Sequence, residues 1–414
     1  MTALAGCGKS PNNASESVSA SELTRGDRNA PSVSAEPPAV QTAAPASEAG
    51  EEISSEDFFK QGVIPRFRIQ ASENCLNQLE SQPRIFVQVD VQVDGVLYRD
   101  VGMHLKGRRG SFRPLESKPG LTLKFNKFRK GQRFHGLEKI HLNNAVQDPS
   151  FMNEILCGQM FREAGVPAAR ATNARVELNG RKLGFYVLVE GVTEDFLHLY
   201  FENTQGNLYD FPYTHEINSS AAKESKDRAP SDLRALASAV KEPDLTKRWQ
   251  RLGRLLDLDR FITYLAMEVM IWDWDCYAMC RNNYRVYHDP DSDKIVFMPH
   301  GLDQIFDNPH GSILPVMKGM VARGVLEIPD GKRLYFERMR TLSEKLFGSE
   351  RMSQQVQALR GRIRPVLLDL NPSAAKRHDQ AVARLEQHIQ QRIASVQNQL
   401  ARPPVEPVPS THFP

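Results

Sequence analysis

The amino-acid sequence predicts an α+β fold, with antiparallel strands in the first half of the folded chain and helices in most of the second. Between residues 85 and 192, apolar and polar residues alternate, and Asp94-Gly95 and Asn179-Gly180 supply tight hairpin turns between such runs. From residue 334 onward, apolar residues recur at helical spacing instead. The 414 residues allow one large or two medium domains.

The composition is that of an ordinary globular protein. Lys and Arg number 53 and Asp and Glu number 50, so the formal charge of +3 gives no reason to expect nucleic acid or an anionic membrane as a partner. A hydrophobic fraction of 40% supports a sizeable core. No run approaches the roughly 18 apolar residues of a membrane span.

The first 55 residues differ from the rest. Leu4-Ala5-Gly6-Cys7 resembles a bacterial lipobox, in which the Cys is lipidated after signal cleavage. Only six residues precede Cys7, so the apolar stretch of a signal peptide is missing: either the match is chance, or the natural start lies upstream. Residues 8–55 are rich in Ser, Ala, Pro and Glu and predict a disordered tether. We therefore expect a lipoprotein of the cell envelope, or a cytoplasmic protein if Cys7 is not lipidated.

The first strands enclose a basic loop. A hairpin is predicted over residues 85–105, and a glycine-containing, Arg-rich loop over 106–113 leads to a strand at 121–125. Lys118 precedes that strand and Lys124 lies inside it. Backbone N–H groups together with Lys or Arg charge bind polyphosphates. The loop lacks the G-x-G-x-x-G pattern, however, and a solvated surface loop is an equally ordinary interpretation.

A helix is predicted to follow, with Asp148 as its N-cap, Pro149 at its first position and Gly165 as its stop. Glu154 lies near the first turn, where a carboxylate favours the helix dipole without any function. Pairing of Glu154 with Lys118 or Lys124 is the functional alternative.

The remaining elements are predicted from the spacing of apolar residues and from the residues that interrupt it. They are strands at 172–178 and 183–192, a polar loop at 214–230, a helical stretch at 231–254 that breaks at Pro243, helices at 334–346, 352–368 and 374–400, and a disordered tail at 403–414.

Residues 271–307 are the most informative stretch. An apolar helical pattern runs into a loop that carries Asp273, Asp275, Asn282 and Asn283, and a hairpin follows that ends just before Asp303. Hard oxygen ligands at the two ends of one hairpin suit Mg²⁺. Protein kinases position metal and substrate with a comparable order of Asp, Asn and Asp. Asp and Asn also form turns and caps, so the residues alone leave both interpretations open.

This stretch also contains a pair of cysteines and a run of alternating aspartates. Cys276 and Cys280 flank the loop, and the sequence does not decide whether they form a disulfide. Asp289, Asp291 and Asp293 have the alternate spacing of a calcium loop, but the Gly at position six and the Glu at position twelve are missing. Turn formation explains them better than a calcium- or carbohydrate-binding module.

In order and spacing, several motifs together resemble the CotH kinase family, named after a bacterial spore coat protein. They are V-G-M-H-L-K-G at 101–107, L-T-L-K-F at 121–125, H-L-N-N-A-V-Q-D-P-S at 141–150, L-N-G-R-K-L-G-F-Y-V-L-V-E at 178–190, G-N-L-Y at 206–209, and the hairpin above. The resemblance implies a divergent protein-kinase fold with two lobes. A β-rich N-lobe would span about 56–192 and a mainly helical C-lobe about 193–402. It also implies ATP and Mg²⁺ or Mn²⁺ as cofactors.

By position, the resemblance assigns a role to individual residues. They are Asp275 as the catalytic-loop Asp, Asn283 and Asp303 as metal ligands, Lys118 as the ATP-binding Lys with Lys124 as the alternative, Glu154 as the partner of that Lys, and Glu190 beside the adenine.

Two departures bear on activity. The family commonly shows P-W-D-L-D where this chain has P-H-G-L-D, so Gly301 replaces one possible metal ligand, and Arg281-Asn282 stands where His-Asn is common. Two functions are therefore expected. One is an extracytoplasmic kinase that phosphorylates hydroxyl groups of an unidentified protein substrate. The other is a catalytically weak pseudokinase that acts as a surface-anchored assembly protein.

Overall fold

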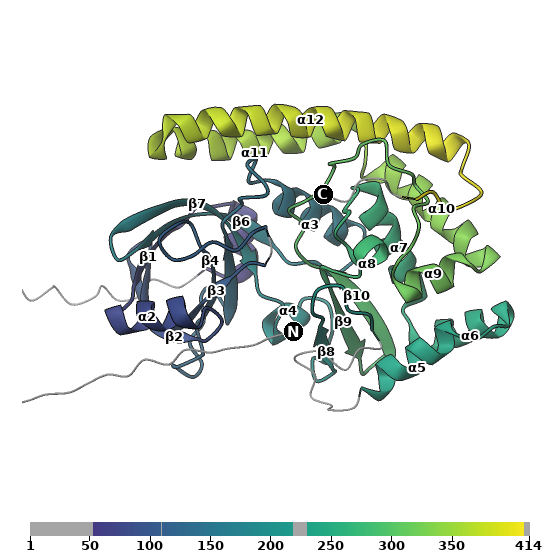
Figure 1. The fold of residues 1–414 in the computed structure, drawn as a ribbon, viewed down its shortest axis with the longest axis horizontal. Coiled ribbons are helices and arrows are strands. Elements are labelled where there is room, and N and C mark those ends of the chain that lie inside the picture. Colours follow the sequence, from purple (N-terminus) through teal and green to yellow (C-terminus); the bar gives the residue numbers. More distant parts are fainter. Residues whose placement is uncertain (1–52, 109, 218–229, 410–414) are drawn as a thin grey trace, which may run out of the picture. The chain divides into compact units, whose positions relative to one another are not determined.

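The computed structural model describes residues 53–108, 110–217 and 230–409 (Figure 1). Cys7, almost all of the predicted tether, most of the predicted loop at 214–230 and the last five residues lie outside the described residues. None of the helices in the described ranges has the length and apolar character needed to cross a membrane.

The amino-terminal part is a closed barrel. In the described part of the chain, its seven strands run in the order β1-β2-β3-β4-β5-β7-β6. Neighbouring strands are antiparallel except β1 and β6, which pair in parallel. The strands are β1 (Arg66–Gln70), β2 (Val87–Val93), β3 (Val96–Lys106), β4 (Gly120–Lys124), β5 (Lys139–Asn143), β6 (Ala171–Leu178) and β7 (Arg181–Glu190). Two short helices, α1 (Ser55–Gln61) and α2 (Glu73–Ser81), accompany them.

The barrel confirms the period-two patterns. Val87, Val89, Val91 and Val93 of β2 are all buried, while Gln88 between them is exposed. The hairpins β2–β3 and β6–β7 lie where the Asp-Gly and Asn-Gly turns predicted them. β1 and β5 were not predicted, because five-residue strands with charged residues among the apolar ones give too short a pattern.

The second part is mainly helical and surrounds a three-stranded sheet of order β10-β9-β8. Ten consecutive residues at the carboxyl end of α7 are buried, which makes this helix the centre of the larger apolar core. The elements are α3 (Asn153–Glu163), α4 (Glu194–Leu197), β8 (Leu208–Asp210), α5 (Ser231–Val240), α6 (Leu245–Leu255), α7 (Leu258–Met270), α8 (Tyr277–Cys280), β9 (Tyr284–Asp289), β10 (Lys294–Pro299), α9 (Met320–Leu326), α10 (Pro329–Lys345), α11 (Ser349–Leu370) and α12 (Pro372–Ala401).

Three predicted boundaries need comment. The helix predicted from Asp148 begins only at Asn153, because Asp148 folds a turn first: its carboxylate accepts from the backbone N–H groups of Ser150 and Asn153, each at 3.0 Å. The break at Pro243 is confirmed, since α5 and α6 end and begin on either side of it. The tail predicted to be disordered from residue 403 is corrected at Val408, which pairs with Pro315.

The last two helices run side by side (Figure 1), and α12 contacts two distant parts of the chain. The Nδ1 atom of His378 donates to the carbonyl of Ser150, at 3.0 Å. The fully buried Arg392 donates to the carbonyls of Val269 and Met270, at 2.7 and 3.0 Å. One helix thereby holds both the approach to α3 and the end of α7. The α+β class, with strands first and helices afterwards, is confirmed in this coarse form.

Candidate functional site

A lysine, an amide and a carboxylate meet where the barrel approaches α3. Lys106 ends β3, Asn143 ends β5 and Glu154 lies in the first turn of α3. Lys106 Nζ donates to Asn143 Oδ1 at 2.5 Å, and Asn143 Nδ2 donates to Glu154 Oε1 at 2.6 Å. Burial raises the pKa of Glu154, and the nearby Lys106 charge opposes that rise. Asn143 therefore bridges a buried cation and a buried acid.

Asp303, just after β10, completes an acidic cluster. The carbonyl oxygen of Asp303 accepts from Asn153 Nδ2 at 2.8 Å, which ties this segment to the start of α3. Burial raises the pKa of Asp303 to about 8, and repulsion from Glu154 and Asp148 adds to the rise. Lys106 acts in the opposite direction. Lys106 thus acts on both Glu154 and Asp303, and the repulsion among the three carboxylates would be relieved by a bound cation.

Positive charge gathers beside this cluster, around His141 and His300. Burial lowers the pKa of both histidines well below the usual range, and Lys106, Lys139 and Arg285 lower it further. His141 Nδ1 lies 3.0 Å from Thr122 Oγ1, while its Nε2 has no hydrogen-bond partner among the described residues. Neutral imidazoles among cations form an environment that favours an anion. A cluster of cations around His141 and His300 therefore lies next to the acidic cluster around Asp303.

The loop after α7 presents a carboxylate oxygen without a partner. Asp275 Oδ2 accepts from the side-chain amides of Asn282 and Asn283, at 2.8 and 3.1 Å. Its Oδ1 has no hydrogen-bond partner among the described residues. Burial raises the pKa of Asp275 to about 6, although the two amides and Arg108 pull it down. At neutral pH this carboxylate is ionised, and its orientation is fixed through one oxygen.

Local backbone geometry holds that loop. Trp272, Arg281 and Asn283 all have left-handed backbone angles, with φ of 48°, 58° and 49°. Such a conformation is unfavourable for a bulky residue and persists only where packing enforces it. Packing does so at Trp272: its ring lies against Gly311, where an added Cβ would come within 2.2 Å, and Arg392 lies 5.2 Å from the ring centroid.

Two oxygen-bearing residues of this region fit a hard divalent cation. Asn283 and Asp303 offer an amide and a carboxylate, and their segments are joined by a hydrogen bond from His300 N to Asn283 O at 2.9 Å. No group of three or more His, Cys, Asp or Glu side chains in the described residues is arranged to hold a metal. A small number of protein ligands is sufficient for Mg²⁺, because it commonly takes one or two carboxylates and fills the other positions with phosphate oxygens and water.

The family follows from comparison with known proteins. Residues 107–396 match the family model described as CotH kinase protein. This chain belongs to the CotH kinase family. The resemblance seen in the sequence motifs is thereby confirmed.

Individual CotH-family relatives are distant. The inner spore coat protein H of Bacillus subtilis (strain 168) is 23% identical over 264 residues, covering 58% of this chain and 72% of that protein. Invasin CotH2 of Rhizopus delemar is 25% identical over 266 residues, covering 55% of this chain and 44% of the invasin.

A solved structure, the Helicobacter pylori proinflammatory kinase CtkA, covers 72% of this chain and 98% of its own. At 7% identity and a TM-score of 0.31, that similarity supports no conclusion about this chain.

Against this CotH background, the two predicted lysines need correction. Lys118 Nζ lies between the rings of Phe151 and Tyr186, 5.1 and 4.9 Å from their centroids, and burial lowers its pKa to about 8. Lys124 Nζ lies 3.8 Å from Glu138 Oε1. The lysine that the structure brings to Glu154 is Lys106. The sequence signal that could have indicated Lys106 is its place at the end of a strand in which apolar and polar residues alternate.

The side chain of Glu190, the residue predicted to lie beside the adenine, contacts another part of the barrel. Its carboxylate is fully buried and bound by Arg170: Arg170 Nε donates to Oε2 at 2.9 Å and Nη2 donates to Oε1 at 2.5 Å. The backbone N–H of Arg170 adds a third bond, at 3.1 Å. The side chain therefore fastens β7 to the start of β6.

The departure from the CotH motif at Gly301 has a structural counterpart. Gly301 has φ +64°, and a Cβ at this position would lie 3.0 Å from both Cγ and Oδ1 of Asn283. A side chain here would be strained and would press on the amide that holds Asp275. The position of the Asn283 amide therefore depends on a glycine at position 301.

Cys276 and Cys280 are free thiols.

Proposed function

We propose that this CotH-family protein is an atypical protein kinase that transfers the γ-phosphate of ATP to a hydroxyl group of a protein. The observation that carries the proposal is the pairing of two poles. An acidic cluster around Asp303 lies beside a cationic cluster around His300, and Asn283 links this region to the oriented Asp275, since its amide donates to Asp275 and its carbonyl accepts from His300 N. That arrangement fits a metal–polyphosphate and an acceptor hydroxyl, since phosphoryl transfer depends on positioning and charge stabilisation.

Each group has a role in this reaction. The hydroxyl oxygen attacks the γ-phosphorus, the bond to the oxygen bridging the β- and γ-phosphates breaks, and ADP leaves. Asp275 Oδ1 takes the hydroxyl proton, for which a pKa of about 6 keeps it ionised at neutral pH. Lys106, oriented by Asn143, neutralises phosphate charge. Bound Mg²⁺ or Mn²⁺ supplies further positive charge, and Asn283 and Asp303 are the residues that would hold it.

We also propose that the reaction takes place in the cell envelope, with Cys7 as lipid anchor. The names of two relatives, a spore coat protein and an invasin, support a location outside the cytoplasm. Expression with the upstream in-frame region, followed by membrane fractionation of wild type and Cys7→Ser, tests this. Soluble cytoplasmic recovery of both proteins would overturn it.

The kinase proposal is tested with labelled ATP, Mn²⁺ and a generic acceptor protein. Asp275→Asn and Lys106→Met are expected to lower phosphate transfer by at least about a hundredfold. Lys124→Met, a lysine outside the acidic cluster, is the matched control and is expected to retain activity. Transfer by the wild type no greater than by Asp303→Ala would refute the proposal.

Gly301 favours a second candidate, a pseudokinase that serves assembly rather than turnover. This candidate predicts no metal-dependent ATP binding. Ligands that bind the folded state raise its melting temperature by mass action. A rise with ATP that requires Mg²⁺ or Mn²⁺ would therefore contradict the pseudokinase, whatever the acceptor.

A further inference from the structure

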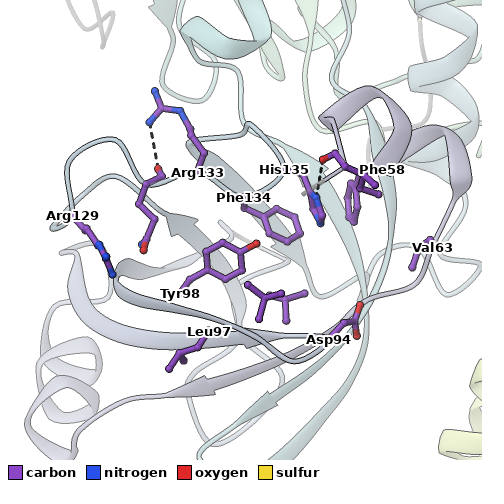
Figure 2. Close-up of a pocket in the computed structure, with 13 residues that line it drawn as sticks. Phe58, Val63, Asp94, Leu97, Tyr98, Arg129, Arg133, Phe134 and His135 are labelled. Carbon is purple, nitrogen blue, oxygen red and sulfur yellow. Dashed lines mark hydrogen bonds between the residues drawn. The ribbon is translucent and has the colours of Figure 1, made fainter. Parts of the chain in front are cut away.

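The end of the barrel opposite Lys106 carries a surface that phosphate transfer does not use. β3 begins at this end, at Val96, and reaches the candidate site at Lys106. The strand between them measures roughly 33 Å at about 3.3 Å per residue. A hollow of about 600 Å³ opens here, with Leu97, Tyr98, Phe134 and Arg129 among its lining residues (Figure 2). We call this region, together with the adjoining loop at 125–133, the mouth surface.

Exposed apolar side chains concentrate on the mouth surface. Ile53, Val63, Val96 and Leu97 line the hollow and are 38–49% exposed. Phe128, 44% exposed, lies next to Arg129 in the adjoining loop. These are five of the twelve exposed large hydrophobic residues in the described part of the chain. A gathering of this kind marks an interaction site more often than scattered single residues do.

The loop of the mouth surface is strongly basic. It reads F-N-K-F-R-K-G-Q-R and contains four cationic residues and no acidic one. Arg133 pairs with Asp195 at 3.2 Å, and Lys127 lies over the ring of Phe86. Arg129 and Lys130 are exposed and form no ion pair with any described residue. Their charge is available to a partner.

One acidic residue lines the hollow, and the structure gives it another contact. Asp94 Oδ1 accepts from the backbone N–H of Arg66, at 3.0 Å. Asp94 keeps its charge, but the four cationic residues of the loop outnumber it, so the mouth surface is positive on balance, directly beside exposed aliphatic groups.

We propose that the mouth surface docks onto an anionic lipid bilayer, with Val96, Leu97 and Phe128 entering the interfacial layer and Arg129 and Lys130 contacting lipid phosphates. Apolar side chains and flanking cations are the two forces that hold proteins on such surfaces. Nucleic acid would match the cations but offers nothing to the aliphatic residues at the hairpin tip. The bilayer accounts for both.

The course of the chain supports this orientation. Ile53, the first described residue, lines the hollow, and its carbonyl accepts from His135 Nδ1 at 3.0 Å. The described part of the chain therefore begins at the mouth surface itself. A membrane-attached amino terminus and a docked mouth surface are compatible on one face. Docking leaves the site at Lys106, at the other end of β3, accessible to a partner.

The proposal is tested by vesicle sedimentation of the full chain carrying Cys7→Ser, so that no lipid anchor contributes. Vesicles of phosphatidylcholine, with and without phosphatidylglycerol, are the probes. We expect binding that requires phosphatidylglycerol and weakens with added salt. Arg129→Ser with Lys130→Ser is expected to lower the partition coefficient at least about tenfold, since each basic residue near an anionic surface contributes roughly fivefold.

Two matched controls distinguish binding through the mouth surface from nonspecific adsorption to vesicles. Leu97→Asp is expected to lower binding, whereas Leu368→Asp on α11, equally exposed, leaves it unchanged. Arg340→Ser with Lys345→Ser, two exposed cations of α10, controls for net charge. Melting temperatures show that each variant is folded. Failure of the unsubstituted chain to prefer phosphatidylglycerol vesicles, or equal losses in the control variants, overturns the proposal. So does retention on RNA or an acidic polypeptide but not on vesicles.

Discussion

The candidate site has two sides, which we call the barrel wall and the loop wall, and the backbone of each is held in a different way. On the barrel wall, Lys106 and Asn143 are the last residues of regular strands, whose ladders fix their backbone. On the loop wall, Asp275 and Asn283 lie in irregular backbone, part of it left-handed. That wall is supported from a distance by Arg392 on α12, more than a hundred residues later. The backbone of the barrel wall is therefore held by its own strands, whereas the backbone of the loop wall depends on remote contacts.

The largest expected effect is chemical and falls on the loop wall. Asp275→Asn removes the proton acceptor, and the rate of phosphate transfer should fall roughly 10²–10⁴-fold. Stability should stay equal or rise, because burial disfavours the charge that is lost. Steady-state kinetics and urea unfolding measure both. A variant that is unfolded, or fully active, would contradict this account of Asp275.

Support from α12 comes next. Arg392→Met removes hydrogen bonds to the carbonyls of Val269, Met270, Pro309 and Gly311. Losing four hydrogen bonds of a fully buried side chain should lower the free energy of unfolding by at least about 3 kcal/mol. Arg340→Met, at an exposed position on α10, should change it by less than about 0.5 kcal/mol. Similar urea midpoints for the two variants would show that the loop wall does not need this helix.

A pH dependence distinguishes the acidic cluster from Asp275. The pKa of Asp303 is raised to about 8 from 3.8, so the stability contribution of its protonated form is present below pH 3.8 and is lost as pH rises towards 8. Holding a cation requires the ionised form. Stabilisation by Mn²⁺ with nucleotide should therefore be larger at pH 8 than at pH 6. Thermal melts of Asp303→Asn should lose this difference, and an unchanged difference would exclude Asp303 as its source.

The smallest expected effect concerns the glycine of the altered motif. Gly301→Ala places a Cβ at φ +64° against Asn283 and should destabilise the fold by about 1 kcal/mol. Gly361→Ala is the contrast: it lies inside α11 with open space around it, so the fold should gain about 1 kcal/mol. Equal changes in both variants would mean that Gly301 tolerates a side chain.

Sequence reasoning predicts a shared site most directly where the candidate residues lie close together along the chain. Asp275, Asn283 and Asp303 fall within one stretch of helix, loop and hairpin, so their order alone indicates a common region. It failed for the lysine. Lys106, Lys118 and Lys124 lie within 19 residues of one another, and nothing local says which of them faces Glu154.

By itself, the sequence determined the alternating strands, their tight turns, the amphipathic helices and the polar loop before Asp303, because each depends on neighbours a few residues apart. Tertiary structure alone decided which polar groups meet. Pairing of β4 with both β3 and β5 aligns the strand ends that bring Lys106 and Asn143 to Glu154. Tertiary structure also engages Glu190 with Arg170 and places Arg392 behind Trp272. Those pairings join residues 11 to 120 positions apart, and the period of a strand or helix carries no information over such separations.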